Sequence, residues 1–111
     1  MFTEGDAEDA LIAEDIGLAA SEMVGNVILH TPDGGTLRAW DPKPDVPYRL
    51  EVEDSSPELP QSPSEANERG GRGLRIVETV SDDWGVIPSE NGKTVWAEFD
   101  RDKRRARKAE E

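Results

Sequence analysis

The chain has 111 residues and no cysteine, 34% of its residues are hydrophobic, and its formal net charge is −12. This length fits one domain rather than two, and the lack of cysteine excludes disulfides and thiolate metal sites. The acidic start and the lack of a run of roughly 20 apolar residues argue against a signal peptide and a membrane span. We therefore expect a single-domain cytoplasmic protein with no membrane contact.

The basic residues gather at the C-terminus. Residues 101–108 hold six of the 13 Lys and Arg side chains, whereas residues 1–99 carry seven basic and 21 acidic ones. An acidic body repels nucleic acid, so this segment would be the only place for it to bind, and a nucleic-acid partner is the least favoured function. We interpret residues 101–111 as a charged tail in solvent that follows a folded domain of residues 1–100.

Apolar side chains recur at helical spacing over residues 8–30 and predict a long amphipathic helix. They are Leu11, Ile12, Ile16, Ala19, Ala20, Met23, Val27 and Ile28. Pro32 and the following Asp33-Gly34-Gly35 end the helix in a turn. Residues 36–40 then read as a short strand, and the turn-forming residues 41–45 predict a hairpin that returns through residues 48–54.

The return strand alternates between apolar and charged residues. Tyr48, Leu50 and Val52 face one way, and Arg49, Glu51 and Glu53 face the other. Asp54 falls in register with the apolar set, where a carboxylate without a partner is costly. It either caps the following loop or accepts a hydrogen bond from something bound there, and the strand pattern favours neither alternative.

Residues 55–69 are polar and rich in proline, and a loop of this length is usually functional or disordered. Gly70, Gly71 and Gly73 precede or open a second helix, whose apolar side chains are Leu74, Ile76, Val77 and Val80. Residues 84–87 and 94–99 read as two strands around an Asn91-Gly92 turn. The order of elements predicts an α+β two-layer sandwich, with helices on one face of a largely antiparallel sheet.

Three small groups of residues could carry chemistry. Glu22 and Asn26 share one helix face and could serve a hydrated magnesium ion, but taken alone the pair favours ordinary surface polarity on an amphipathic helix. The glycines at the start of the second helix could let backbone N–H groups approach an anion, or could merely form a turn. Gly92-Lys93-Thr94 fails as a phosphate-binding P-loop because Ile87 stands where its first glycine is needed and a strand follows.

Taken in chain order, these segments resemble the boxes of the GHKL ATP-binding domains, the superfamily of gyrase B, Hsp90 and histidine-kinase catalytic domains. The N-box resembles residues 21–30 (SEMVGNVILH), the G1 box resembles Asp54-Ser55-Ser56-Pro57, and the G2 box resembles residues 71–74 (GRGL). The closing motif resembles residues 92–96 (GKTVW). The likeness spans about residues 10–99 and is greatest to the actinobacterial anti-sigma-factor serine/threonine kinases.

This resemblance implies a Bergerat-type fold that binds ATP and Mg²⁺. Asp54 would accept a hydrogen bond from the adenine amino group, Asn26 would ligate Mg²⁺, and Glu22 would be the catalytic base. Residues 55–70 would form a lid over ATP that ends at Gly71, Gly73 and Leu74. Thr94 would lie near adenine, although strand alternation with Val95, Ala97 and Phe99 inward places it outward.

The resemblance implies a kinase that transfers the ATP γ-phosphate to a serine or threonine of an anti-sigma-factor antagonist, with the antagonist or the sigma factor as partner. The alternative is a nucleotide-binding module that acts by binding a partner protein. Family members normally carry a strand and a helix ahead of the N-box helix, so we expect either a truncated N-terminus or an edge that a partner covers. A homodimer is left open, and a histidine kinase is disfavoured because no pair of dimerisation helices is present.

Overall fold

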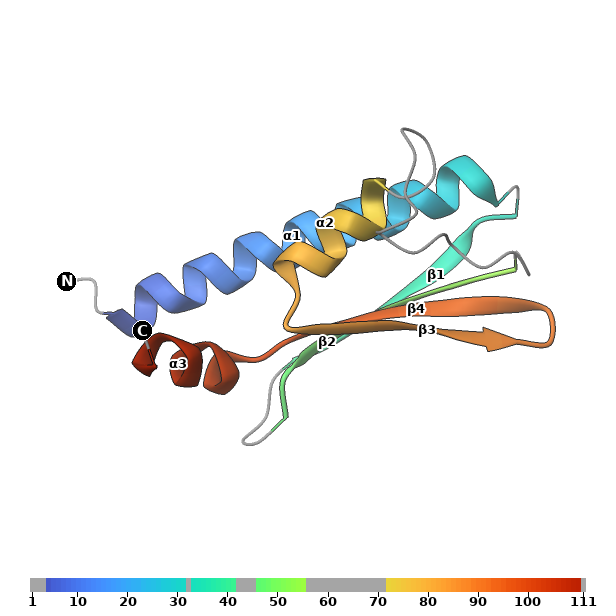
Figure 1. Cartoon of the computed structure of the whole chain (residues 1–111). Coiled ribbons are helices and arrows are strands. Elements are labelled where there is room, and N and C mark those ends of the chain that lie inside the picture. Colours follow the sequence, from blue (N-terminus) through green and yellow to red (C-terminus); the bar gives the residue numbers. More distant parts are fainter. Residues whose placement is uncertain (1–3, 32, 42–45, 56–71, 111) are drawn as a thin grey trace.

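A computed structural model describes residues 4–31, 33–41, 46–55 and 72–110 of the chain (Figure 1). The elements in order are α1 (Glu4–His30), β1 (Gly35–Trp40), β2 (Tyr48–Asp54), α2 (Arg72–Val80), β3 (Asp83–Ser89), β4 (Gly92–Phe99) and α3 (Arg101–Ala109). The predicted α+β class is confirmed, and each predicted helix and strand is present with bounds shifted by a few residues. No helix in these ranges combines the length and the apolar character that a bilayer crossing needs.

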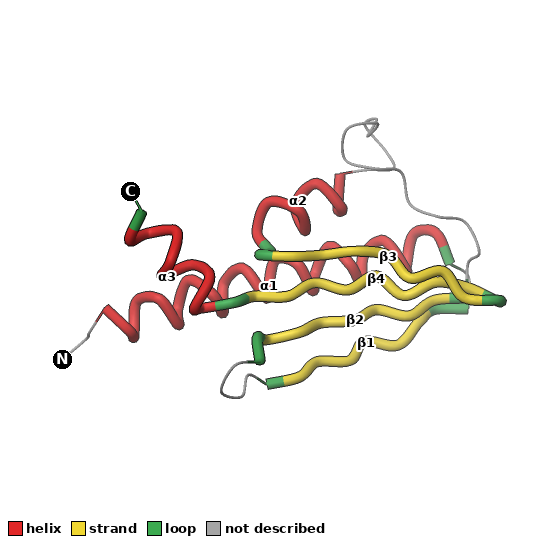
Figure 2. The backbone as a smooth tube through the Cα atoms, turned by 60° about the horizontal axis from the view of Figure 1, so that its bottom comes forward, coloured by secondary structure: helices red, strands yellow, loops and turns green. Residues whose placement is uncertain are grey.

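The strands form one sheet in the order β1-β2-β4-β3, and all three neighbouring pairs are antiparallel (Figure 2). β2 pairs with β4 without a bulge from Tyr48 opposite Phe99 to Asp54 opposite Lys93. Helices α1 and α2 run antiparallel to each other over one face of the sheet, and none of the described residues forms a helix on the opposite face (Figure 1). The predicted two-layer arrangement is therefore confirmed.

The core lies between the two helices and the covered face of the sheet. It consists of Ile12, Ala19, Met23 and Val27 of α1, Leu74 and Val77 of α2, and Leu50, Val52, Val95, Ala97 and Phe99 of the sheet. Leu11 and Ile28 were predicted to belong to the apolar stripe, but their exposed fractions are 60% and 73%. Adjacent positions on a helix point about 100° apart, so these two side chains turn away from the sheet that their neighbours Ile12 and Val27 face.

The predicted turn after α1 is confirmed, and two glycines make it tight. Gly34 has a φ of 74°, which L-residues with a side chain rarely adopt, and its N–H donates to the carbonyl of Thr31 over 3.2 Å. At Gly35 a Cβ would lie 2.4 Å from the Glu53 carbonyl oxygen and 3.0 Å from Cγ1 of Val27. The end of α1 therefore lies directly over the start of β1.

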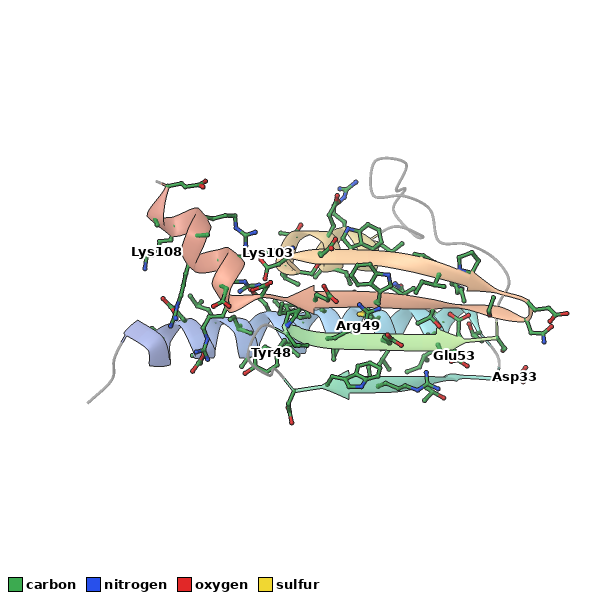
Figure 3. The ribbon with its side chains drawn as sticks, turned by 90° about the horizontal axis from the view of Figure 1, so that it is seen from below. Asp33, Tyr48, Arg49, Glu53, Lys103 and Lys108 are labelled. Carbon is green, nitrogen blue, oxygen red and sulfur yellow. The ribbon has the colours of Figure 1, made fainter. Side chains whose placement is uncertain are left out.

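The face of the sheet without a helix carries ion pairs. Arg49 donates to Glu51 over 2.8 Å and to Glu98 over 2.7 Å, and its guanidinium lies 4.5 Å from the ring centroid of Trp96. Figure 3 shows this face, with Arg49 near its centre. A cation held over the ring of Trp96 and between two carboxylates places charge at the centre of this face.

Residues 101–109 of the basic C-terminal segment form helix α3. Asp100 caps the helix by accepting from the backbone N–H groups of Asp102 (3.0 Å) and Lys103 (3.1 Å). α3 buries none of its own residues. Ion pairs attach it instead to the first half of α1. Arg101 pairs with Asp9, and Arg105 pairs with Glu8.

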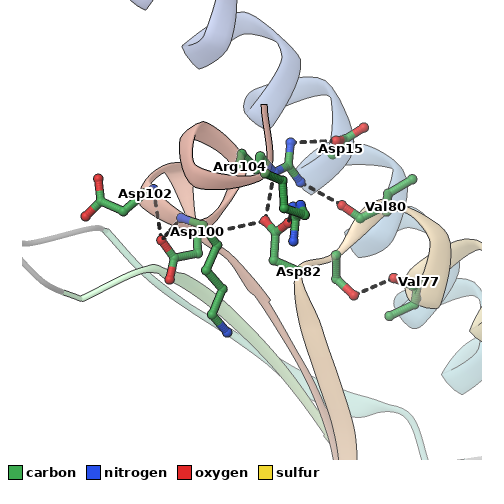
Figure 4. A network of polar contacts seen from close by, with 10 residues as sticks. Asp15, Val77, Val80, Asp82, Asp100, Asp102 and Arg104 are labelled. Carbon is green, nitrogen blue, oxygen red and sulfur yellow. Dashed lines mark hydrogen bonds and ion pairs between the residues drawn. The ribbon is translucent and has the colours of Figure 1, made fainter. Parts of the chain in front are cut away.

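Arg104 and Asp82 form the centre of this attachment (Figure 4). Arg104 donates to Asp82 over 2.7 Å, to Asp15 over 2.9 Å and to the Val80 carbonyl over 2.8 Å. The Asp82 side chain is 3% exposed and also accepts from Arg107 and from the Asp100 backbone N–H. Burial alone raises the pKa of this carboxyl, but the hydrogen bonds it accepts outweigh burial and hold the pKa below its ordinary value.

We expect Asp82→Ala to lower the free energy of unfolding by about 2–3 kcal/mol, because it leaves two guanidinium groups and a backbone N–H without their buried acceptor. Chemical denaturation measures this change. Asp83→Ala is the matched control, since Asp83 is the exposed neighbour and accepts one hydrogen bond from the Trp84 N–H. The control should change stability by less than about 1 kcal/mol, and equal effects at both positions would contradict the assignment.

The lowered pKa of Asp82 also predicts that the stability lost in Asp82→Ala depends on pH. A carboxyl whose pKa is lowered by folding stabilises the protein fully above its unfolded pKa of about 3.9, and loses that contribution as the pH falls further. The stability difference between wild type and Asp82→Ala should therefore be constant near neutrality and shrink below about pH 4. A difference that persists unchanged at lower pH would show that the charge of Asp82 is not its source.

Candidate functional site

Several of the segments singled out in the sequence come together at one end of the molecule. The C-terminal end of α1, the end of β2 and the start of β4 lie at this end, and the N-terminus of α2 is directed toward it (Figure 1). The contact between Val27 and Gly35 fixes α1 over the sheet here, and Gly35 is the register partner of Asp54. The helix turn that carries Asn26 therefore lies over the end of the strand that carries Asp54.

Asp54 and Lys93 form a buried ion pair across β2 and β4. Their side chains are 4% and 10% exposed, and 3.1 Å separates the Lys93 ammonium from the carboxylate. The two residues stand directly opposite each other in the register, on the face that also carries Val52 and Val95. The predicted inward position of Asp54 is confirmed, and Lys93 shares this buried face.

The glycine before Lys93 lets the two strands meet closely at the pair. A Cβ on Gly92 would lie 1.9 Å from the Asp54 carbonyl oxygen and 3.0 Å from the Cα of Ser55. No side chain fits in that space, so any substitution of Gly92 must shift the start of β4 away from the end of β2. Gly92 thus positions both members of the ion pair.

Glu22 and Asn26 are both partly buried and border the core residues Ala19 and Met23 on α1. Within the described ranges, neither side chain makes a hydrogen bond or ion pair to another residue. They offer a carboxylate and a carboxamide, both of which supply oxygen ligands to hard cations. Among the described residues, no group of three or more His, Cys, Asp or Glu side chains could hold a metal ion.

The remaining predicted site residues lie in different parts of the molecule, and some lie outside the described residues. Gly73 and Leu74 lie in the first turn of α2, where backbone N–H groups lack helical acceptors, and the Leu74 side chain is 2% exposed in the core. Gly71 and most of the predicted lid, residues 55–70, lie outside the described residues. Thr94 lies opposite Glu53 in an unbroken register, on the other face of the sheet from Asp54. The structure therefore does not bring its side chain to the ion pair, and its role at adenine stays a prediction.

Lys93 is the residue of this region that sequence reasoning missed. The signal was present, because Lys93 is two positions before Val95 and shares its inward face by strand alternation. The likeness of Gly92-Lys93-Thr94 to a P-loop suggests phosphate chemistry instead, which the strand that follows does not support.

A family model described as the histidine kinase-like ATPase domain matches residues 5–99. Among solved structures, the histidine kinase domain of the blue-light activated histidine kinase of Erythrobacter litoralis is similar, with a TM-score of 0.66 and 24% identity. The match covers 86% of this chain and 48% of that one, so this chain spans about half of that domain. No curated protein matches the chain.

We expect the Asp54–Lys93 pair to contribute little net stability despite strong coupling. Asp54→Leu or Lys93→Met alone should lower the free energy of unfolding by about 2–4 kcal/mol, because each leaves the opposite charge buried without this partner. The double variant should return to within about 1 kcal/mol of wild type. Chemical denaturation of the four proteins measures the coupling.

The exposed pair Arg38–Glu53 provides the matched control for this cycle. Its N–O distance is 3.0 Å, but its side chains are 43% and 52% exposed. The coupling measured with Arg38→Met and Glu53→Leu should be below about 1 kcal/mol. If both cycles give the same small value, the Asp54–Lys93 pair is not desolvated.

Proposed function

The chain belongs to the histidine kinase-like ATPase family, and on this premise we propose that it binds ATP·Mg²⁺ at the end of the molecule that carries Asp54. We further propose that it is a protein serine/threonine kinase of the anti-sigma-factor type. Its substrate would be a serine or threonine of an antagonist protein, and its setting the cytoplasm. The observation that carries the proposal is the buried Asp54 carboxylate at the end of β2, beneath the helix turn that presents Asn26.

Asp54 would hold adenine through its carboxylate. A buried carboxylate accepts hydrogen bonds only, and bonds to a charged acceptor are stronger than those between neutral groups. The adenine amino group is a matching donor. Because Asp54 ends its strand, a base bound there would lie at the margin of the core, where apolar side chains can contact its ring.

The phosphates would lie between α1 and the first turn of α2. A protein with net charge −12 binds a polyanion only where local groups offset the repulsion. Mg²⁺ usually takes one or two protein ligands and completes its shell with phosphate oxygens and water, which fits Asn26 as a single ligand. The first N–H groups of α2, including those of Gly73 and Leu74, have no acceptor within the helix and suit an anion.

Glu22 would act as general base one helical turn from Asn26. The oxygen of the substrate hydroxyl would attack the γ-phosphorus, the bond from that phosphorus to the β–γ bridging oxygen would break, and ADP would leave. The hydroxyl proton would pass to the Glu22 carboxylate. Positioning and the metal ion supply most of the catalysis in such reactions, so Glu22 would affect the transfer step more than ATP affinity.

A nucleotide-binding module without phosphoryl transfer is the second candidate. The Asp54–Lys93 pair favours it, because the carboxylate oxygen proposed for adenine already accepts from an ammonium. A protein in which the base competes with this ammonium would bind nucleotide weakly and act mainly through its partner.

We expect wild type to bind ATP·Mg²⁺, and Asp54→Asn and Asn26→Ala each to weaken binding by about ten- to a hundredfold, the equivalent of one lost hydrogen bond to a charged group. The Asn26 variant should also lose the dependence of affinity on Mg²⁺. Calorimetric titration measures both effects. Asp33→Asn and Asn91→Ala, at exposed turns, should bind like wild type. Folded wild-type protein that binds no ATP would refute the proposal.

Phosphoryl transfer separates the two candidates. With labelled ATP and a purified candidate antagonist, wild type should form an acid-stable phosphoester. Glu22→Gln should slow transfer by about 10²- to 10⁴-fold with ATP affinity unchanged. Glu14→Gln, an exposed carboxylate on the same helix, should not. An acid-labile product would identify histidine as the acceptor, and no transfer despite tight ATP binding would favour the binding module.

A further inference from the structure

Lys93 places a buried ammonium beside the carboxylate proposed to hold the nucleotide base. The register sets the two residues directly opposite each other, and their charged groups lie 3.1 Å apart. Gly92 brings β4 against the backbone of Asp54, so neither side chain can be moved far by a shift of the strands. A hydrogen-bond acceptor, the Asp54 carboxylate, and a donor, the Lys93 ammonium, therefore lie side by side on the helix-covered face.

Stability alone does not account for a lysine at this position. Lysine is almost never fully buried unless it is paired, and a buried ion pair is often no more stabilising than packed apolar residues of similar volume. The neighbours of Lys93 on its face of β4, Val95, Ala97 and Phe99, are all apolar and buried. A further apolar residue would continue this face without desolvating a charge.

The chemistry of the pair matches the edge of a purine base. A carboxylate only accepts hydrogen bonds, while an ammonium only donates them and carries three N–H groups. The Watson–Crick edge of adenine presents a donor, the 6-amino group, next to an acceptor, ring nitrogen N1. Resting on the proposed function, in which Asp54 accepts from the amino group, we propose that Lys93 donates a hydrogen bond to adenine N1.

This assignment gives Lys93 a role in base selection. A ring nitrogen that is buried without a donor loses its bond to water and gains nothing in return. A site built to hydrogen-bond a substrate atom rejects an analogue that lacks it, because the site's own buried group is then left unpaired. Hypoxanthine presents the reverse order, an acceptor at position 6 and an N–H at position 1, and would meet Asp54 and Lys93 with the wrong groups.

The test compares ATP, 1-deaza-ATP and ITP, each with Mg²⁺, by calorimetric titration. In 1-deaza-ATP a C–H replaces N1, and the amino group and phosphates are unchanged. Wild type should bind ATP at least about tenfold more tightly than either analogue. Lys93→Met keeps an unbranched side chain one atom shorter and removes the donor, so its ATP affinity should fall to about that of wild type for 1-deaza-ATP. Lys103→Met, an exposed lysine on α3, removes the same charge and should retain the wild-type preference.

Three results would overturn the role of Lys93 while leaving ATP binding intact. Equal wild-type affinity for ATP and 1-deaza-ATP would show that nothing donates to N1. Tighter ATP binding by Lys93→Met would show that Lys93 competes with the base for Asp54. An equal loss for both nucleotides in that variant would place the ammonium at the phosphates. The comparison of ATP with 1-deaza-ATP on wild type needs no variant, so it tests recognition of N1 even if Lys93→Met fails to fold. Wild type that binds no nucleotide refutes the proposed function itself.

Discussion

The antiparallel register of β2 against β4 is the constraint on which the rest of the molecule depends. Side chains alternate between the two faces of a strand, so a slip of one residue would move every inward group to the outer face. The observed register buries Leu50, Val52, Val95 and Phe99 under the helices and sets Asp54 opposite Lys93. The same register sends Arg49 and Trp96 outward. Core and candidate site are thus consequences of one alignment.

Much of this arrangement could be predicted because it follows from local patterns. Alternation along β2 correctly placed Asp54 inward, and the apolar spacing of α1 identified Ile12, Ala19, Met23 and Val27. The same spacing wrongly included Leu11 and Ile28, which are exposed, because the sequence does not define how wide a stripe of the helix the sheet covers. Lys93 obeyed the same alternation and was overlooked. The roles of Glu22, Asn26, Thr94 and the glycines are not fixed by the backbone and remain proposals.

Helix α3 could not be predicted from its own residues. It has no apolar side that would indicate packing, and its attachment depends on acidic groups far away in the chain. Arg104 reaches Asp82, 22 positions away, and Asp15, 89 positions away. A charged segment looks the same in sequence whether its partners are water or distant carboxylates. Only the fold decides that the connection between α2 and β3 and the first half of α1 present those carboxylates together.

Two kinds of interaction therefore stabilise the molecule, and they respond differently to ionic strength. The α1–α2–sheet core is held by apolar burial, which dissolved salt hardly weakens. The contact of α3 with α1 buries no residue of α3 and relies on charges, several of them exposed, whose attraction fades as ionic strength rises because the screening length shortens to about 8 Å at physiological salt. Ionic strength can therefore weaken the more exposed pairs of the C-terminal helix, Arg101–Asp9 and Arg105–Glu8, before it affects the buried Asp82 contact or the layer that carries Asp54 and Lys93.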